Sequence, residues 1–202
     1  MWVIEMRPIT SFLAILVALA LLDQPLAAGQ REDINAAFKF TDRGDYVSAL
    51  KILVPLADEG VSIAQALLGA LYLEGKGVKR DYAKAVAWYR KSAEQGFAGA
   101  QFELGAMYDK GMGVSRDTRE AAKWFSKAAE AGVGKAQYNL ASMYANGEGV
   151  AQDWVLAHMW FSLAAVNGVA NGSKGRDAAE KNLSPRDVAR AQRMAREWIE
   201  KH

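Results

Sequence analysis

The chain has 202 residues, of which 51% are hydrophobic and 24% are charged, so it can bury a continuous core. Its 25 basic and 23 acidic side chains leave a net charge of only +2, which argues against a nucleic-acid partner because such proteins usually carry a clustered basic face. The absence of cysteine excludes disulfides, thiol catalysis and thiolate metal sites, and with two histidines we expect no metal site.

The N-terminal segment is typical of a secretory signal peptide. Arg7 precedes an uncharged apolar run from Ile9 to Leu22, and small residues follow near Ala28 and Gly29. At about 1.5 Å per residue the run is shorter than a hydrocarbon core of about 30 Å, which argues against a stable membrane anchor. We predict that residues 1–28 are removed by cleavage near Ala28 or Gly29 and that the protein is periplasmic or secreted. An uncleaved anchor and a buried first helix are the alternatives.

Two helices are predicted between the leader and residue 60. The first is short, from about Ile34 to Phe40, and the second starts near Asp45 and ends at Gly60. The dipeptide Asp45-Tyr46 recurs 36 residues later as Asp81-Tyr82. Residues 31–60 are therefore predicted to form a degenerate first unit of a repeat array.

Three full units follow with a period of 36 residues, at 64–96, 100–132 and 136–168. Each contains an Ala-Gln pair, a leucine, a tyrosine, a Gly-x-Gly-Val loop, an aspartate, a tryptophan and a closing glycine. In the first unit these are Ala64-Gln65, Leu68, Tyr72, Gly75, Gly77, Val78, Asp81, Trp88 and Gly96. A fixed period of this kind indicates units that must stack to cover their apolar faces.

Each full unit is predicted to be a helix, a glycine-rich turn and a second helix. Residues 64, 65, 68, 69 and 72 share one helix face, where Ala64 and Gly69 permit close approach of the second helix. The loop glycines supply positive φ angles, the aspartate caps the second helix, and the closing glycine ends it.

Residues 169–202 are predicted to form a C-terminal helical cap. A polar turn at 171–175 precedes a short helix near Arg176 to Leu183, and Ser184-Pro185 starts the last helix. Its predicted inner stripe is Val188, Ala191, Ala195 and Trp198, and its predicted outer face includes Arg186, Arg193, Glu197 and Glu200.

The 36-residue pattern resembles the Sel-one-like repeat family, which is related to tetratricopeptide repeats. The resemblance is specific from Ala64 to Gly168 and looser in the flanks. It implies an all-α fold, a right-handed α-solenoid of stacked antiparallel helix pairs, with the repeat array at 31–168. Some secreted relatives in a cysteine-rich branch are described as binding or hydrolysing β-lactams or cell-wall fragments, but this sequence lacks all of those cysteines.

In solenoids of this kind the first helix of each unit lines the concave side, so its outward residues are the candidate partner-binding set. Unlike the core positions they differ from unit to unit, as expected of a surface that recognises one partner. Leu67, Phe102 and Tyr138 are the candidate anchors, and packing against a neighbouring first helix is the alternative for them. The full predicted set is Leu67, Glu74, Phe102, Glu103, Asp109, Lys110, Tyr138, Asn139 and Asn146.

The sequence supports a catalytic role less well than a partner-binding role. The Gly-x-Gly loops connect helices and lack the strand and the third glycine of a dinucleotide site. The recurring aspartates are explained as helix caps, and His158 beside Met159 and Trp160 is expected to be packed or half-exposed. We therefore predict no catalytic residue and no cofactor.

The sequence favours an exported scaffold that binds a peptide or partner domain through the concave face, a role that would suit a regulator of an envelope signalling or assembly system. The alternatives are a cell-wall-ligand-binding or hydrolytic envelope protein, and a structural element of a larger envelope complex.

Overall fold

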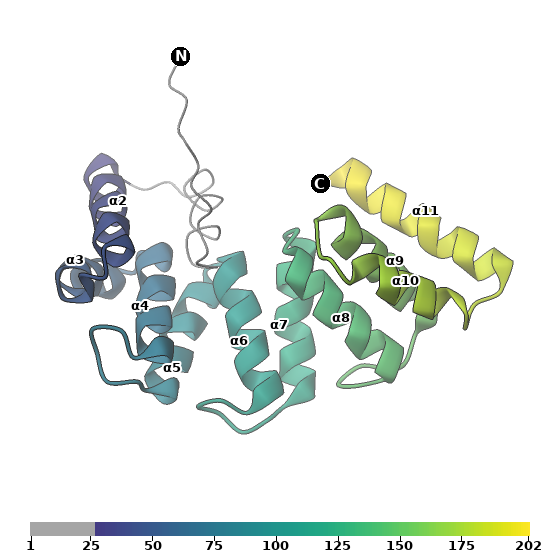
Figure 1. Cartoon of the computed structure of the whole chain (residues 1–202), viewed down its shortest axis with the longest axis horizontal. Helices are drawn as coiled ribbons and strands as arrows, with labels where there is room; N and C mark the ends of the chain where they lie inside the picture. The colour runs from purple at the N-terminus through teal and green to yellow at the C-terminus, as the bar shows by residue number, and fades with distance from the viewer. Residues whose placement is uncertain (1–26) are drawn as a thin grey trace, which may run out of the picture. The chain divides into compact units, whose positions relative to one another are not determined.

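The computed structural model describes residues 27–202, and within this range the chain is helical and contains no strand (Figure 1). The all-α prediction is confirmed. The predicted signal peptide lies almost entirely outside the described residues, and cleavage after Ala28 or Gly29 would fall in the first turn of helix α2. Between residues 27 and 202, no helix combines the length and apolarity needed to cross a membrane.

The chain divides into two compact units, of which the first ends at Phe97. Its helices are α2 (Ala28–Asp42), α3 (Tyr46–Asp58), α4 (Ser62–Glu74) and α5 (Tyr82–Glu94), and each packs against the next. Helix α2 is longer than the predicted helix at 34–40. Only Ile34 and Ala37 of α2 are buried, so the apolar pattern marks the contacting turns and not the exposed ends of the helix.

The second unit runs from Ala98 to His202. It contains α6 (Ala98–Lys110), α7 (Thr118–Glu130), α8 (Gly134–Asn146), α9 (Trp154–Val166), α10 (Gly172–Glu180) and α11 (Pro185–Lys201). Helices α6 and α7 form one pair and α8 and α9 form the next, while α10 and α11 both pack against α9. The stacked helix pairs implied by the 36-residue period are therefore present.

In the three full repeats the predicted caps and turns are present at the expected residues. Asp81, Asp117 and Asp153 each accept backbone N–H groups of the following helix, at 2.9 to 3.1 Å. The glycines of the loop at 75–77 have φ angles of 72° and 71°, a left-handed conformation that side chains resist. The sequence rule for where each second helix starts is therefore confirmed.

Small residues on the first helices allow the two helices of a pair to approach closely. A Cβ placed on Gly69 would lie 3.0 Å from the Tyr89 ring, and one placed on Gly105 would lie 2.9 Å from the Phe125 ring. Both rings are buried. The glycine at this position therefore provides the space for the aromatic residue of the second helix.

Helix α10 differs from the prediction. Residues 172–175 of the expected polar turn are helical, and the helix ends at Glu180, not near Leu183. The reason is tertiary packing: a Cβ on Gly172 would lie 2.5 Å from the Ala165 backbone nitrogen, and one on Gly175 would lie 2.5 Å from the Phe161 ring. Glycines that disfavour an isolated helix here allow α10 to pack closely on α9.

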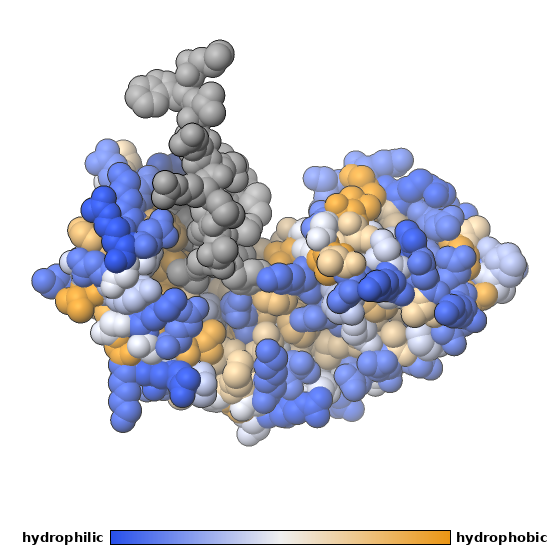
Figure 2. All heavy atoms as spheres, viewed as in Figure 1, coloured by the Kyte–Doolittle hydropathy of each residue, from blue (hydrophilic) through white to orange (hydrophobic). Residues whose placement is uncertain are grey.

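The last helix, α11, has the two faces that the sequence predicts. Ala191 and Ala195 are its buried residues, and the Trp198 ring lies edge-on to that of Trp160 at 6.3 Å between centroids. The predicted outer residues are exposed: Arg186, Arg193, Glu197 and Glu200. Figure 2 shows mostly hydrophilic residues over this helix, which is the outer face that a terminal repeat needs.

In two of the Ala-Gln pairs the buried glutamine, Gln65 or Gln137, links consecutive helix pairs within one compact unit. The Gln137 amide donates to the Ala129 carbonyl at 3.2 Å, near the end of α7, and its oxygen accepts from the Asn167 amide at 2.8 Å, just after α9. Gln65 makes the matching bonds in the first unit, to the Ala57 carbonyl and from the Gln95 amide. These hydrogen bonds fix one pair against the next.

We predict that Gln137→Met, which keeps the side-chain length, lowers the free energy of unfolding by about 1–3 kcal/mol because it leaves buried polar partners unsatisfied. Urea unfolding followed by circular dichroism measures the loss. Gln152→Met is the control, since the exposed Gln152 also donates to a carbonyl, that of Ala145, at 2.8 Å. Equal losses in the two variants would show that the buried link contributes nothing special.

Candidate functional site

The predicted partner-binding residues lie on the first helices of the three full repeats. Leu67 and Glu74 lie on α4, four residues lie on α6, and three lie on α8. Leu67 is only 2% exposed, so in this structure it is a buried side chain and not an exposed anchor. Helix α4 is apolar around most of its circumference, and all residues from Ser62 to Leu71 are buried, as expected of a helix without a polar face.

Phe102 and Tyr138 are half-buried, and both pack against the hydrophobic core of the second unit. The Phe102 ring centroid lies 5.8 Å from that of Phe125, and the Tyr138 centroid lies 5.2 Å from that of Phe161. Each anchor thus packs on the aromatic residue of its own second helix. These contacts hold the rings in place while part of each remains accessible.

The polar members of the set differ in exposure. Glu74, Lys110 and Asn146 are the last residues of their helices and are exposed, whereas Glu103, Asp109 and Asn139 are half-buried. Glu74 forms an ion pair with Lys76, and hydrogen bonding to this carboxylate raises the pKa of the Lys76 ammonium. The exposed helix ends are therefore the most accessible part of the predicted surface.

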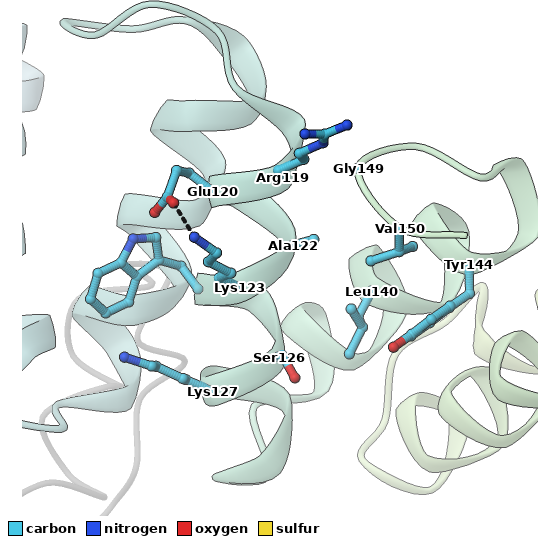
Figure 3. A pocket seen from close by; sticks show the side chains of 11 residues that line it. Arg119, Glu120, Ala122, Lys123, Ser126, Lys127, Leu140, Tyr144, Gly149 and Val150 are labelled. Atoms are coloured by element: carbon cyan, nitrogen blue, oxygen red, sulfur yellow. Dashed lines mark hydrogen bonds and ion pairs between the residues drawn. The ribbon is translucent and has the colours of Figure 1, made fainter. Parts of the chain in front are cut away.

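A pocket of about 640 Å³ lies on the second unit, between α7, α8 and the loop that follows α8. Figure 3 shows Arg119, Lys123 and Lys127 along α7, and Leu140, Tyr144 and Val150 on α8 and the loop that follows it. In this view Lys123 and Lys127 extend from α7 away from those three residues. Lys123 is paired with Glu120. This volume is within the usual range for ligand pockets, about 300–1,000 Å³.

The indole of Trp124 lines this pocket and is its most unusual polar group. Trp124 is 7% exposed, and its buried Nε1–H donates no hydrogen bond within the described part of the chain. The Lys127 ammonium lies 4.3 Å from the centre of a Trp124 ring, a cation–π contact. Most buried polar groups in proteins are satisfied, so an orphan donor beside a pocket suggests a missing acceptor.

Tyr144 supplies a second donor to the same pocket. Burial raises the pKa of its phenol, with smaller contributions in the same direction from Asp153 and Glu130. Because the phenol pKa is raised above its ordinary value near 10, the group is protonated at neutral pH and can donate a hydrogen bond.

His158 on α9 is fully buried. Of the two environments expected for it, packed or half-exposed, the structure shows the packed one. Its Nε2 atom lies 3.5 Å from a carboxylate oxygen of Glu180 on α10, within ion-pair distance, but neither ring nitrogen forms a hydrogen bond with any residue from 27 to 202. Burial lowers the pKa of His158, while the Glu180 carboxylate opposes this effect. The position is buried and apolar in the preceding repeats, where Val86 and Ala122 occupy it.

Residues 27–202 contain no cluster of three or more histidine, cysteine or acidic side chains that could hold a metal ion. His158 and Glu180 are the one histidine–carboxylate pair in that range, and the histidine is closed off from solvent.

Sequence reasoning missed the pocket between α7 and α8. It interpreted the recurring tryptophan, Trp124 in this repeat, as part of the repeat core, and it did not consider the basic residues of α7. A usable signal was present, because Arg119, Lys123 and Lys127 follow a four-residue spacing that places them near one another on a helix.

Comparison with solved structures identifies bacterial proteins of similar fold. A Sel1 repeat protein from Oxalobacter formigenes shares 36% sequence identity at a TM-score of 0.66, covering 68% of this chain and 56% of that chain. A protective antigen of uropathogenic Escherichia coli with an SLR fold shares 27% identity at a TM-score of 0.60, covering 94% of this chain and 48% of that chain. This chain thus spans about half the length of each.

The cysteine-rich protein B of Helicobacter pylori shares 20% identity at a TM-score of 0.51, over 65% of this chain and 95% of that chain, which is a likeness of fold alone. No curated protein matches the sequence significantly. The Sel1 repeat model matches residues 62–97, 98–133 and 134–169, together more than half of the chain. On these three consecutive matches and on the helix pairs that they form, the chain belongs to the Sel1 repeat family.

Proposed function

We propose that this protein is an exported scaffold that binds a peptide or a partner domain through the outward residues of α6 and α8. Proteins with Sel1 repeats are generally scaffolds for protein–protein interaction. The observation that carries the proposal is the pair of half-exposed rings, Phe102 and Tyr138, at equivalent positions of successive first helices. Aromatic side chains held in place by packing are typical interface anchors.

The side chains at the C-terminal ends of α6 and α8 support recognition of one particular partner. The helix ends carry Asp109 and Lys110 in one repeat but Ala145 and Asn146 in the next, although the core positions recur. Leu67 is omitted from the proposed contact set because it is buried. The proposal therefore rests on α6 and α8 of the second unit.

Export is the second part of the proposal. It is supported by the sequence from Arg7 to Gly29, with its charge, its short apolar run and its small-residue end. An exported scaffold could serve an envelope signalling or assembly system. The mass of the protein isolated from the periplasm or medium tests this part: loss of about 28 residues is expected, and retention of the full-length mass would contradict cleavage.

Co-purification from the native envelope tests the binding surface. We expect Phe102→Ala/Tyr138→Ala to lose a partner that the wild-type protein retains. Because both rings also contact the core, a second variant, Lys110→Glu/Asn146→Lys, changes only exposed helix ends and should weaken the same partner.

The matched control is Val166→Ala, which alters an exposed apolar side chain at the end of α9. All variants are compared by thermal melting, so that a lost partner is scored only for a folded protein. Retention of the partner by both double variants would show that the outward residues of α6 and α8 are not the binding surface.

A further inference from the structure

We propose that the pocket between α7 and α8 is a second binding site, which takes an acidic peptide segment carrying an apolar side chain. The site is distinct from the outward residues of α6 and α8 and shares none of them. The proposal goes beyond the scaffold function, because it names a separate surface and the chemistry of its ligand.

Charge determines the class of ligand. Three cationic side chains line the pocket, at Arg119, Lys123 and Lys127, and the one lining carboxylate, Glu120, is already paired with Lys123. Within residues 27–202, no acidic side chain forms an ion pair with Arg119 or Lys127. The surplus of cations therefore favours a ligand that carries carboxylates.

Length favours a peptide over a small anion. Arg119 and Lys127 are eight residues apart on one helix, a rise of about 12 Å. An extended chain advances about 3.3 Å per residue, so about four residues span the distance between the two cations. A pocket of about 640 Å³ also exceeds what a single carboxylate or phosphate would fill.

The remaining lining supplies apolar contact and hydrogen-bond donors. Leu140 and Val150 provide an apolar wall for an aliphatic or aromatic side chain. The buried Trp124 indole N–H has no acceptor among the described residues, and a backbone carbonyl or carboxylate of the ligand would satisfy it. A surface that only attracted small ions from solvent would need neither the apolar wall nor the indole donor.

Fluorescence anisotropy with labelled hexapeptides tests the proposal. The probes are a peptide of Asp and Glu with one central Leu, and its isosteric analogue with Asn and Gln in place of the acids. We expect the wild-type protein to bind the acidic peptide at least tenfold more tightly than the amide analogue. The affinity should fall as salt is raised.

Lys123→Glu/Lys127→Glu should weaken the acidic peptide at least tenfold. Lys174→Glu/Lys181→Glu makes the same charge change on exposed residues outside the pocket and should cost less than threefold. Because a reversed charge at position 123 would repel Glu120, Lys123→Gln/Lys127→Gln is a milder second version. Trp124→Phe keeps an aromatic ring without the indole donor and should weaken binding severalfold, without changing its salt dependence.

Several results would overturn the proposal: no binding of the acidic peptide at low salt, equal binding of the amide analogue, or equal losses in the pocket variant and the charge-matched control. Displacement of the peptide by a single-stranded oligonucleotide at equal affinity would also overturn it, in favour of a general polyanion surface. Phe102→Ala/Tyr138→Ala should bind the acidic peptide normally, so failure of the scaffold proposal and failure of this one are distinguishable.

Discussion

Gly149→Ala is expected to lower the free energy of unfolding of the second unit by about 3–5 kcal/mol. Gly149 has a φ of 72°, a left-handed conformation that costs a residue with a side chain about 1–2 kcal/mol. In addition, a Cβ at this position would overlap the backbone carbonyl of Thr118 at the start of α7. Backbone cannot move aside as a flexible side chain can, so the two costs combine.

Gly168→Ala is the matched control for this prediction. Gly168 lies in the same unit with a φ of 77°, but a Cβ there would meet nothing within 4 Å. It should therefore show only the conformational cost, about 1–2 kcal/mol. Guanidinium unfolding of both variants measures the difference. If Gly149→Ala were no more destabilising than Gly168→Ala, the close approach of this loop to α7 would not contribute to stability.

The comparison of these glycines shows which part of the fold could be predicted from sequence. Glycine at 149 and 168 indicated a positive φ in both cases, because that requirement is local. The contact between the Gly149 loop and α7 could not be predicted, since it depends on how one helix pair stacks on another. The same distinction holds for Asp117, whose capping role followed from its place before a helix.

Packing between elements accounts for the main difference between prediction and structure. Gly172 and Gly175 indicated a turn by local propensity, but they lie in α10 because α9 leaves no room there for a side chain. Leu67 was predicted to face a ligand from its helical position, yet α4 is buried on nearly every side. Helical periodicity identifies a face but does not tell what covers it.

The candidate sites show the same limit. Phe102 and Tyr138 were selected because they vary between repeats, and the structure adds that each ring packs on the aromatic residue of its own pair. The pocket beside α7 depends on Leu140 and Val150 from the next repeat, which lie more than ten residues from Lys127 in sequence. A spacing argument within one helix could not find it.

Acidification is expected to destabilise the second unit through His158. Burial lowers the pKa of the folded imidazole below its ordinary value near 6.5, so below that pH the unfolded chain binds more protons than the folded chain. The contribution of His158 to the free energy of unfolding should therefore not change with pH above about pH 6.5. It should fall as the pH drops from there to the lowered pKa, and one pH unit between the two pKa values corresponds to about 1.4 kcal/mol.

The charged groups around the imidazole set the steepness of this loss. On α10, the carboxylates of Glu180 and Asp177 raise the pKa of His158, whereas the Arg176 guanidinium lowers it, and burial outweighs them. Glu180→Gln removes the nearest compensating charge, so its stability should fall more steeply between pH 6.5 and 5 than that of the wild-type protein. His158→Gln, which cannot titrate, should lose less stability over the same interval.

Urea unfolding of the three proteins between pH 5 and 8 measures these slopes, and the difference between wild type and His158→Gln cancels the titration of other groups. Parallel curves for wild type and His158→Gln would contradict the prediction. If they differ as expected, the histidine that replaces Val86 and Ala122 at this repeat position makes the packing of α10 on α9 sensitive to acid.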